Sequence, residues 1–149
     1  IRMQQHHADP GVFIRSMAAR GFPGGLAATT RDVATLLDAA GFDVVIIETV
    51  GVGQSEVEIA RLAQVTVVVL VPGAGDDIQS IKAGIMEIAQ VFAINKADLP
   101  GADTLANTLH ADAETDAEIV KTIALEGKGI TELLTAIRRA KPQSLTNKP

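Results

Sequence analysis

Four short apolar runs, rich in β-branched residues, constrain the fold of this chain more than any other feature. They cover residues 43–48, 65–71, 91–94 and 119–124, and the fourth is less purely apolar than the others. Runs that do not alternate with polar residues indicate strands buried on both faces. Their first residues lie roughly 20–30 positions apart, the length of a strand–helix–strand unit. The chain is therefore predicted to be α/β, with a doubly wound, mostly parallel sheet.

Segments with helical spacing or capping signals lie before and between these runs. We expect helices over residues 9–20, 29–40, 55–64, 77–90 and 131–139. Asp9 is expected to cap the first helix, and Gly41 to end the second. Thr29 or Thr30 is expected to cap the second helix, with a place near a phosphate in a switch loop as the alternative. Residues 100–118 are polar and weakly patterned, and the tail over 141–149 is expected to be flexible. Residues 1–140 are then one domain.

Composition narrows the classes of function. The 149 residues suffice for one domain with a core. The net charge of −5, without a basic block, argues against nucleic acid or an anionic membrane as the main partner. No apolar run approaches the roughly 18–20 residues of a membrane span. The absence of cysteine excludes disulfides and thiolate metal sites and is compatible with a cytoplasmic location.

The third run ends in Asn95-Lys96-Ala97-Asp98, which fits the guanine-specificity pattern Asn-Lys-x-Asp. Guanine presents two donors on one edge, and a carboxylate at Asp98 offers two acceptors in matching geometry. Adenine lacks that donor pattern and would leave the acid unpaired. Lys96 can lay its methylene stem along the base, and Asn95 can brace the loop. The alternative is an ordinary polar turn after a strand.

Two further strand ends carry matching elements. After the fourth run, Ala124 and Leu125 fit a loop that offers a backbone N–H to the base carbonyl. After the first run, Glu48-Thr49-Val50-Gly51 fits an acid-x-x-Gly phosphate sensor. Glu48 can hold Mg²⁺ directly or through water, and the Gly51 N–H can approach a terminal phosphate. Carboxyl ends of parallel strands share one edge of a sheet, so these elements are expected to meet there.

The amino-acid sequence resembles that of the MeaB/ArgK family of GTPases. These proteins are chaperones of adenosylcobalamin-dependent methylmalonyl-CoA mutase. The resemblance is carried by Glu-Thr-Val-Gly-Val-Gly-Gln-Ser-Glu over residues 48–56, with support from residues 24–30, 72–79 and 125–130. It covers residues 1–100 almost continuously and then about 119–137.

The resemblance implies a P-loop NTPase-like fold of the SIMIBI class, binding of GTP or GDP with Mg²⁺, and a homodimer. It implies that Glu48 is the Mg²⁺-associated catalytic acid, that residues 51–54 belong to a switch, and that residues 73–80 form a further switch that contacts the partner. Gln54 is a candidate for orienting the attacking water, with solvation of a helix start as the alternative. The implied partner is methylmalonyl-CoA mutase or a related mutase, and the implied role is to gate cofactor loading and protect the mutase.

The chain departs from the family pattern at several places. The phosphate-binding loop Gly-x-x-x-x-Gly-Lys-Ser/Thr is absent from these residues, and the chain begins at Ile1, so we expect an N-terminally truncated fragment that binds GTP poorly and hydrolyses it negligibly alone. Residues 101–118 are shorter than the usual connection, and Ile123 stands where the family often has serine. The C-terminal dimerisation arm is largely absent.

Two other functions compete with this interpretation. One is a non-catalytic interaction domain that has lost its phosphate loop. The other is a metal-insertion GTPase of the nickel-chaperone type, which typically carries histidine or cysteine clusters. Against the latter, the chain has no cysteine and only three histidines, of which His6 and His7 are adjacent and do not face each other on a helix.

Overall fold

The computed structural model describes residues 3, 6, 8–17, 25–49, 58, 60–73, 88–112 and 117–140. The chain divides into two compact units, Ile1–Leu62 and Ala63–Pro149, and each is described by itself. Among the described residues, none of the helices combines the length and apolarity that crossing a bilayer requires. The predicted single domain over residues 1–140 stays a prediction.

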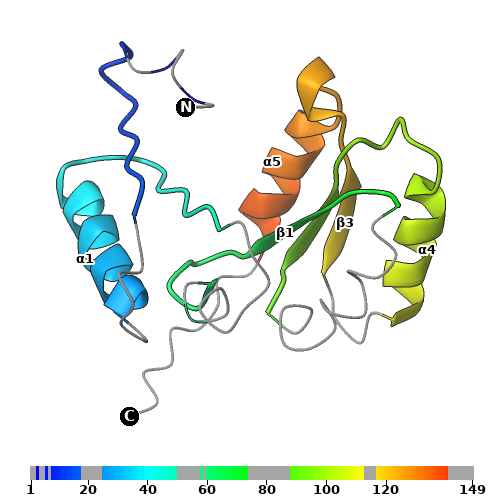
Figure 1. Ribbon diagram of the computed structural model, residues 1–149, viewed down its shortest axis with the longest axis horizontal. Helices are drawn as coiled ribbons and strands as arrows, with labels where there is room; N and C mark the ends of the chain where they lie inside the picture. The colour runs from blue at the N-terminus through cyan, green and yellow to red at the C-terminus, as the bar shows by residue number, and fades with distance from the viewer. Residues whose placement is uncertain are drawn as a thin grey trace. The chain divides into compact units, whose positions relative to one another are not determined.

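The first unit contains helix α1, Gly25–Ala39, which begins earlier than predicted (Figure 1). Thr29 and Thr30 therefore lie a full turn inside the helix, and the prediction that one of them is its cap is wrong. Thr30 is buried, and its hydroxyl lies 3.9 Å from the sulfur of Met17. A buried threonine with a tertiary contact is better placed within the helix than at its solvated end.

The end of α1 follows the prediction. Gly41 has a φ of 85°, which only glycine adopts without strain. Its N–H donates to the Asp38 carbonyl at 3.0 Å, and the Phe42 N–H donates to the Leu37 carbonyl at 3.1 Å. These two bonds form a Schellman motif, which satisfies carbonyls that the helix end leaves without partners.

The helix predicted over residues 9–20 is wrong in its described part, residues 9–17, which form a turn and a segment without regular secondary structure. The Asp9 carboxylate accepts a hydrogen bond from the Gly11 N–H at 2.9 Å. This local bond makes a turn, so Asp9 competes with the helix that it was expected to cap. Phe13 instead lies against Phe42, with ring centroids 6.4 Å apart. Residues 18–20 lie outside the described part.

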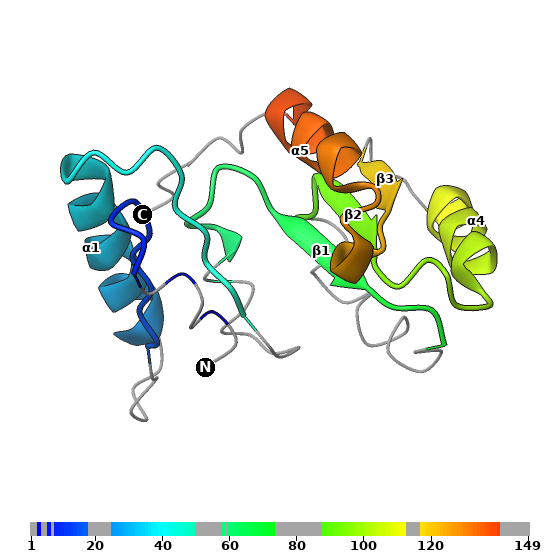
Figure 2. The same cartoon turned by 90° about the horizontal axis from the view of Figure 1, so that it is seen from above.

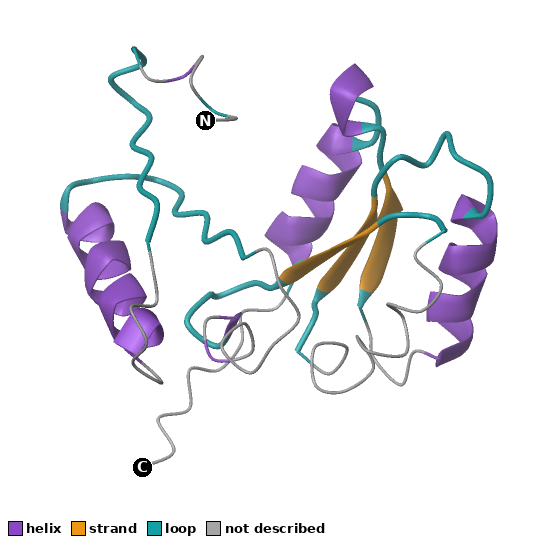
Figure 3. Cartoon of the chain, in the orientation of Figure 1, coloured by secondary structure: helices purple, strands orange, loops and turns teal. Residues whose placement is uncertain are grey.

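The strand predicted over residues 43–48 is also wrong. Residues 44–49 belong to no ladder and have no regular secondary structure, and Figure 3 draws them as loop. Val44 and Ile46 are 72% and 86% exposed. A β-branched run becomes a strand only when neighbouring strands satisfy its backbone, and no described residue of this unit pairs with it.

The second unit confirms the other three predicted strands and the α/β fold class. The strands are β1 (Val67–Leu70), β2 (Val91–Ile94) and β3 (Glu118–Lys121). They pair in parallel in the order β1-β2-β3, with Val67 opposite Val91 and Val91 opposite Glu118. A parallel α/β sheet of this kind is consistent with a P-loop NTPase-like fold.

Helices α4 (Ala102–Asp112) and α5 (Ile130–Arg139) cover opposite faces of this sheet (Figure 2). Phe92 and Ile94 of β2 pack with Leu105 and Leu109 of α4. Val91 packs on the other face with Ala136 of α5. The alternation along β2 makes it the centre of both apolar clusters, and all four of its residues are buried.

The helices match the predictions unevenly. Helix α5 was predicted to within one residue, whereas α4 was not expected. Of the helix predicted over residues 55–64, Glu58 and Ala60 are helical and residues 61–64 form a turn and a bend. Of the helix predicted over residues 77–90, residues 77–87 lie outside the described part. The tail over 141–149 also lies outside it.

Candidate functional site

Strand β2 ends in the Asn95-Lys96-Ala97-Asp98 loop. The Asn95 N–H donates to the Leu70 carbonyl at 2.8 Å, which continues the sheet pairing past β2. Lys96 has a φ of 56°, and its carbonyl accepts from the Leu99 N–H at 3.0 Å. The chain therefore turns sharply after the strand, and the carboxylate of Asp98 is left exposed to solvent.

The loop after β3 turns back on itself within residues 122–129. Its base is closed by a bridge between Ile123 and Lys128, in which the Ile123 N–H donates to the Lys128 carbonyl at 3.0 Å. Between them lies a single 3₁₀ turn, η2 (Ala124–Glu126), which ends at Gly127 with a φ of 70°. We call residues 122–129 the β3 loop.

The Asn95 side chain joins the two loops. Its Oδ1 accepts from the Ala124 N–H at 3.1 Å and from the Thr122 hydroxyl at 3.3 Å. The backbone adds a further link, because the Ala97 N–H donates to the Thr122 carbonyl at 3.0 Å. Thr122 is only 3% exposed, so this end of the junction is buried, whereas the bond at Ala124 is exposed. Residues 27 and 29 positions apart in the chain are thus held at one sheet edge.

The junction does not engage every backbone donor of the β3 loop. Ala124 and Leu125 are the predicted sources of an N–H for a base, and the Ala124 N–H is engaged by Asn95. Within the described part of the chain, the Leu125 N–H has no acceptor, and its side chain is fully exposed. An exposed N–H on a loop tied to the Asp98 loop can donate to a ligand carbonyl.

Charged side chains surround the β3 loop. Lys128 Nζ lies 2.6 Å from Glu126 Oε2. The hydrogen bond and charge of Glu126 raise the pKa of Lys128, and the Asp98 carboxylate raises it further. Glu126 therefore pairs with the lysine and leaves the Asp98 carboxylate available to a ligand.

The phosphate-side predictions belong to the other unit or lie outside the described residues. Glu48 is exposed in the first unit, while Gly51 and Gln54 lie outside the described part, as do residues 74–80. The described residues contain no group of three histidine, cysteine, aspartate or glutamate side chains arranged for a metal. Mg²⁺ commonly takes only one or two protein carboxylates, with phosphate and water completing its shell, so the exposed carboxylate of Glu48 has suitable chemistry for that ion.

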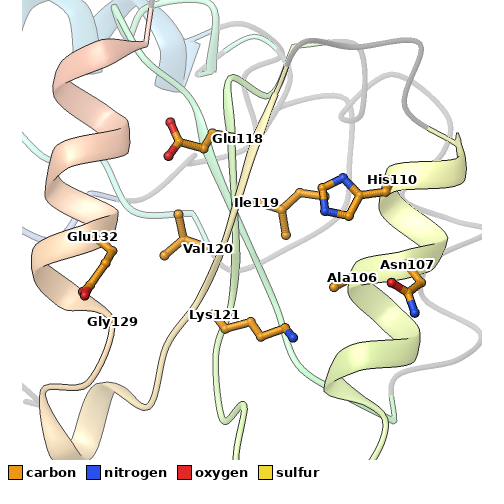
Figure 4. Close-up of a pocket in the computed structure, with 9 residues that line it drawn as sticks. All are labelled: Ala106, Asn107, His110, Glu118, Ile119, Val120, Lys121, Gly129 and Glu132. Carbon is orange, nitrogen blue, oxygen red and sulfur yellow. The ribbon is translucent and has the colours of Figure 1, made fainter.

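A groove of about 550 Å³ follows the outer edge of β3, between α4 and α5 (Figure 4). Glu118 and Glu132 line it, and Lys121 points toward α4. Lys121 pairs with Asp103, and this hydrogen bond and charge lower the pKa of Asp103. The groove touches the β3 loop only at Gly129, and the sequence did not predict it because α4 was not expected.

The sequence analysis also missed Thr122 and Gly129. Thr122 lies in an apolar run, where its buried hydroxyl has no distinctive signal. Gly129 lies within residues 125–130, which entered only as support for the family resemblance, and it precedes the helix predicted over residues 131–139. Its closeness to β3 depends on contacts that no local pattern encodes.

The family model described as "Methylmalonyl Co-A mutase-associated GTPase MeaB" matches residues 1–147. The chain belongs to the MeaB family. This confirms the family resemblance of residues 48–56, and it agrees with the parallel α/β sheet and the joined Asn-Lys-x-Asp and β3 loops.

Proteins similar to this chain occur in an archaeon, a bacterium and a mammal. A Pyrococcus abyssi protein named "Putative GTPase" is 53% identical over 148 residues, covering 93% of this chain and 46% of that protein. GTPase ArgK of Escherichia coli is 37% identical over 91% of this chain and 44% of its own length. The mouse methylmalonic aciduria type A homolog, mitochondrial, is 32% identical over 98% of this chain and 38% of its own length. The chain thus spans about half the length of the first two and less of the third.

Proposed function

We propose that this chain forms the guanine-recognising part of a GTP-hydrolysing protein. Asp98 accepts both donors of the guanine edge, the Leu125 N–H donates to the base carbonyl, and the stem of Lys96 covers the base plane. The observation that carries this proposal is the Asn95 side chain, which ties the Asn-Lys-x-Asp loop to the β3 loop at 3.1 Å. The GTPase names of the relatives support the same reaction.

Nucleotide titration of the full polypeptide that carries this sequence tests the proposal. Calorimetry with GTP, GDP and ATP should give binding of both guanine nucleotides and at least hundredfold weaker binding of ATP, because two unpaired acceptors on Asp98 cost roughly 3 kcal/mol. Equal affinity for ATP and GTP would contradict guanine recognition. No binding of any nucleotide would favour the non-catalytic interaction domain instead.

We further propose that the acid at Glu48 serves Mg²⁺ at the terminal phosphates, with Gly51 offering its N–H to the last phosphate. A bound Mg²⁺ would neutralise charge on the phosphates during hydrolysis. Glu48 supplies an oxygen ligand or a hydrogen-bond acceptor for a water of the ion. Gly51 places no side chain between its N–H and a phosphate.

Glu48→Gln is expected to lower Mg²⁺-dependent GTP hydrolysis by roughly 10- to 100-fold while changing GTP affinity much less. The substitution keeps the size of the side chain and removes only the charge that attracts the cation. The measurement is kcat as a function of Mg²⁺ concentration, alongside the GTP dissociation constant. Glu58→Gln, a matched change at a neighbouring glutamate, serves as the control. Unchanged kcat and Mg²⁺ dependence would assign Glu48 a structural role.

The partner that we propose is an adenosylcobalamin-dependent acyl-CoA mutase, whose cofactor loading and protection the GTPase gates as a homodimer. The support is the family description, which names methylmalonyl-CoA mutase, together with the mouse relative's name. Adding the purified mutase should raise the rate of GTP hydrolysis and form a complex on size-exclusion chromatography. A mutase that changes neither the rate nor the elution volume would contradict this partner.

A further inference from the structure

The backbone at Gly129 passes so close to the end of β3 that only glycine fits there. Its φ is 75°, in the region that side chains disfavour. An added Cβ would lie 2.1 Å from the Lys121 carbonyl oxygen and 3.1 Å from the Thr122 Cα. Both neighbours are backbone atoms of the sheet, so a larger residue must displace either the β3 loop or the strand end.

This close approach anchors the returning end of the β3 loop. The loop starts at Thr122, whose N–H donates to the Ile94 carbonyl at 2.8 Å, and it returns at Gly129 against Lys121. Helix α5 begins at once, and its Leu133 N–H donates to the Gly129 carbonyl at 3.0 Å. If the backbone at Gly129 is displaced, α5 resists the movement on its C-terminal side. The displacement is therefore expected to move the β3 loop on its N-terminal side.

The Leu125 N–H, the donor proposed for the base carbonyl, lies between these anchors. The bond between the Ile123 N–H and the Lys128 carbonyl closes the loop next to Gly129. The bond from the Ala124 N–H to Asn95 holds the loop toward Asp98. The N–H of Leu125 follows directly after this second bond. Its distance from a base held by Asp98 thus depends on where Gly129 places the loop.

We propose that Gly129 is a positioning residue for guanine recognition, which sets the Leu125 N–H at hydrogen-bonding distance from the guanine O6. This inference rests on the proposed guanine-binding function and adds a residue that does not touch the nucleotide. A hydrogen bond is sensitive to a displacement of a few tenths of an ångström and to the donor angle. A substitution at Gly129 that displaces the loop is therefore expected to weaken the hydrogen bond to one ligand atom, O6. The base edge that faces Asp98 is expected to keep its contacts.

The loop contains a matched control at Gly127. Gly127 also has a positive φ, 70°, but an added Cβ there meets nothing within 4 Å. Gly127→Ala and Gly129→Ala thus introduce the same side chain into the same loop at similar backbone angles. Only the second introduces a collision with the sheet, so a difference between the two variants reports the close approach.

The experiment compares three nucleotides on the full polypeptide by calorimetry. GTP has the O6 acceptor, ITP keeps O6 but lacks the 2-amino group, and 6-thio-GTP keeps both donors for Asp98 but replaces O6 with sulfur, a weak acceptor. Gly129→Ala is expected to weaken GTP and ITP binding on the order of tenfold, the worth of one net hydrogen bond, with little change for 6-thio-GTP. Gly127→Ala is expected to keep the wild-type preference for GTP over 6-thio-GTP.

Equal losses for all three nucleotides in Gly129→Ala, or no loss for any, would overturn the positioning role. If that variant fails to fold by circular dichroism, the Leu125 amide resonance of the wild-type protein decides. A change in the chemical shift of this amide on adding GTP, but not on adding 6-thio-GTP, supports the inference. The same change with both nucleotides overturns it. If the wild-type protein binds no GTP, the proposed function itself is overturned. If it binds GTP with an affinity that does not depend on residue 129, only the positioning role is overturned.

Discussion

Asp98→Ala is expected to weaken GTP binding by about tenfold to more than a hundredfold, corresponding to roughly 1.5–3 kcal/mol for hydrogen bonds to a charged group. The guanine ring N–H and amino group would both lose their acceptor. The exposed carboxylate sits on a turn whose backbone is bonded to Leu70 and Thr122, so the truncation should leave the loop in place. Calorimetric titration of the full polypeptide with GTP measures the effect.

Asp103→Ala provides the matched control for Asp98→Ala. Asp103 is also an exposed aspartate in the second unit, but it lies on α4 and pairs with Lys121 at the groove beside β3. Its removal should leave GTP affinity within about twofold, since exposed ion pairs contribute little. ITP sharpens the test, because it lacks one of the two donors and should be less affected by Asp98→Ala than GTP. Unaltered GTP affinity in Asp98→Ala would remove this residue from the site.

Phe92→Ala is expected to lower the free energy of unfolding by about 3–5 kcal/mol. Phe92 is 1% exposed at the centre of β2 and packs in the cluster that joins the sheet to α4. The substitution leaves a cavity that neighbouring strands and the helix cannot fill without breaking the parallel register. Urea unfolding of the full polypeptide, with hydrogen exchange of the β2 amides, measures the loss.

The control for Phe92→Ala is Leu134→Ala on α5, where the leucine side chain is 49% exposed. Less than about 1 kcal/mol is expected there, since a partly exposed side chain loses less apolar contact and leaves no enclosed cavity. Similar losses for the two variants would mean that β2 is not the centre of the apolar core.

The sheet of the second unit could be predicted because its signals are local. β2 is apolar along its whole length, and its flanking turn is marked by Asn95 and Asp98. The unexpected helix α4 has the helical spacing Ala102, Leu105, Ala106 and Leu109, all buried. Two of these are alanines, whose small side chains give weak contrast with the polar residues around them. The helix was therefore visible in the pattern but faint.

The errors in the first unit have a different origin. The run from Val44 to Ile47 has the composition of a buried strand, but strand formation depends on neighbours that local composition does not specify. At Asp9, one residue type serves both helix caps and turns, and the glycine two positions later favours the turn. In both cases the local sequence is compatible with two backbone conformations, strand or loop in the first and helix or turn in the second. Tertiary contacts decide between them.

The residues proposed to bind the base were predicted by type, and they were expected to meet at one sheet edge, but the individual contacts between them were not predicted. The Asn-Lys-x-Asp pattern points to a base because its donor and acceptor chemistry is specific. That Asn95 also accepts from Ala124, and that Gly129 lies against Lys121, follows from two parallel strands placed side by side. Contacts of this kind arise only once the sheet has formed.

Lys96 has a consequence for how this protein could evolve or be engineered. It holds a left-handed backbone conformation, which costs a residue with a Cβ roughly 1–2 kcal/mol relative to glycine. Selection for stability alone would favour glycine there, whereas the proposed packing of the lysine stem on the base would favour the strained residue. The position is thus one where gains in thermal tolerance and in nucleotide affinity are expected to oppose each other.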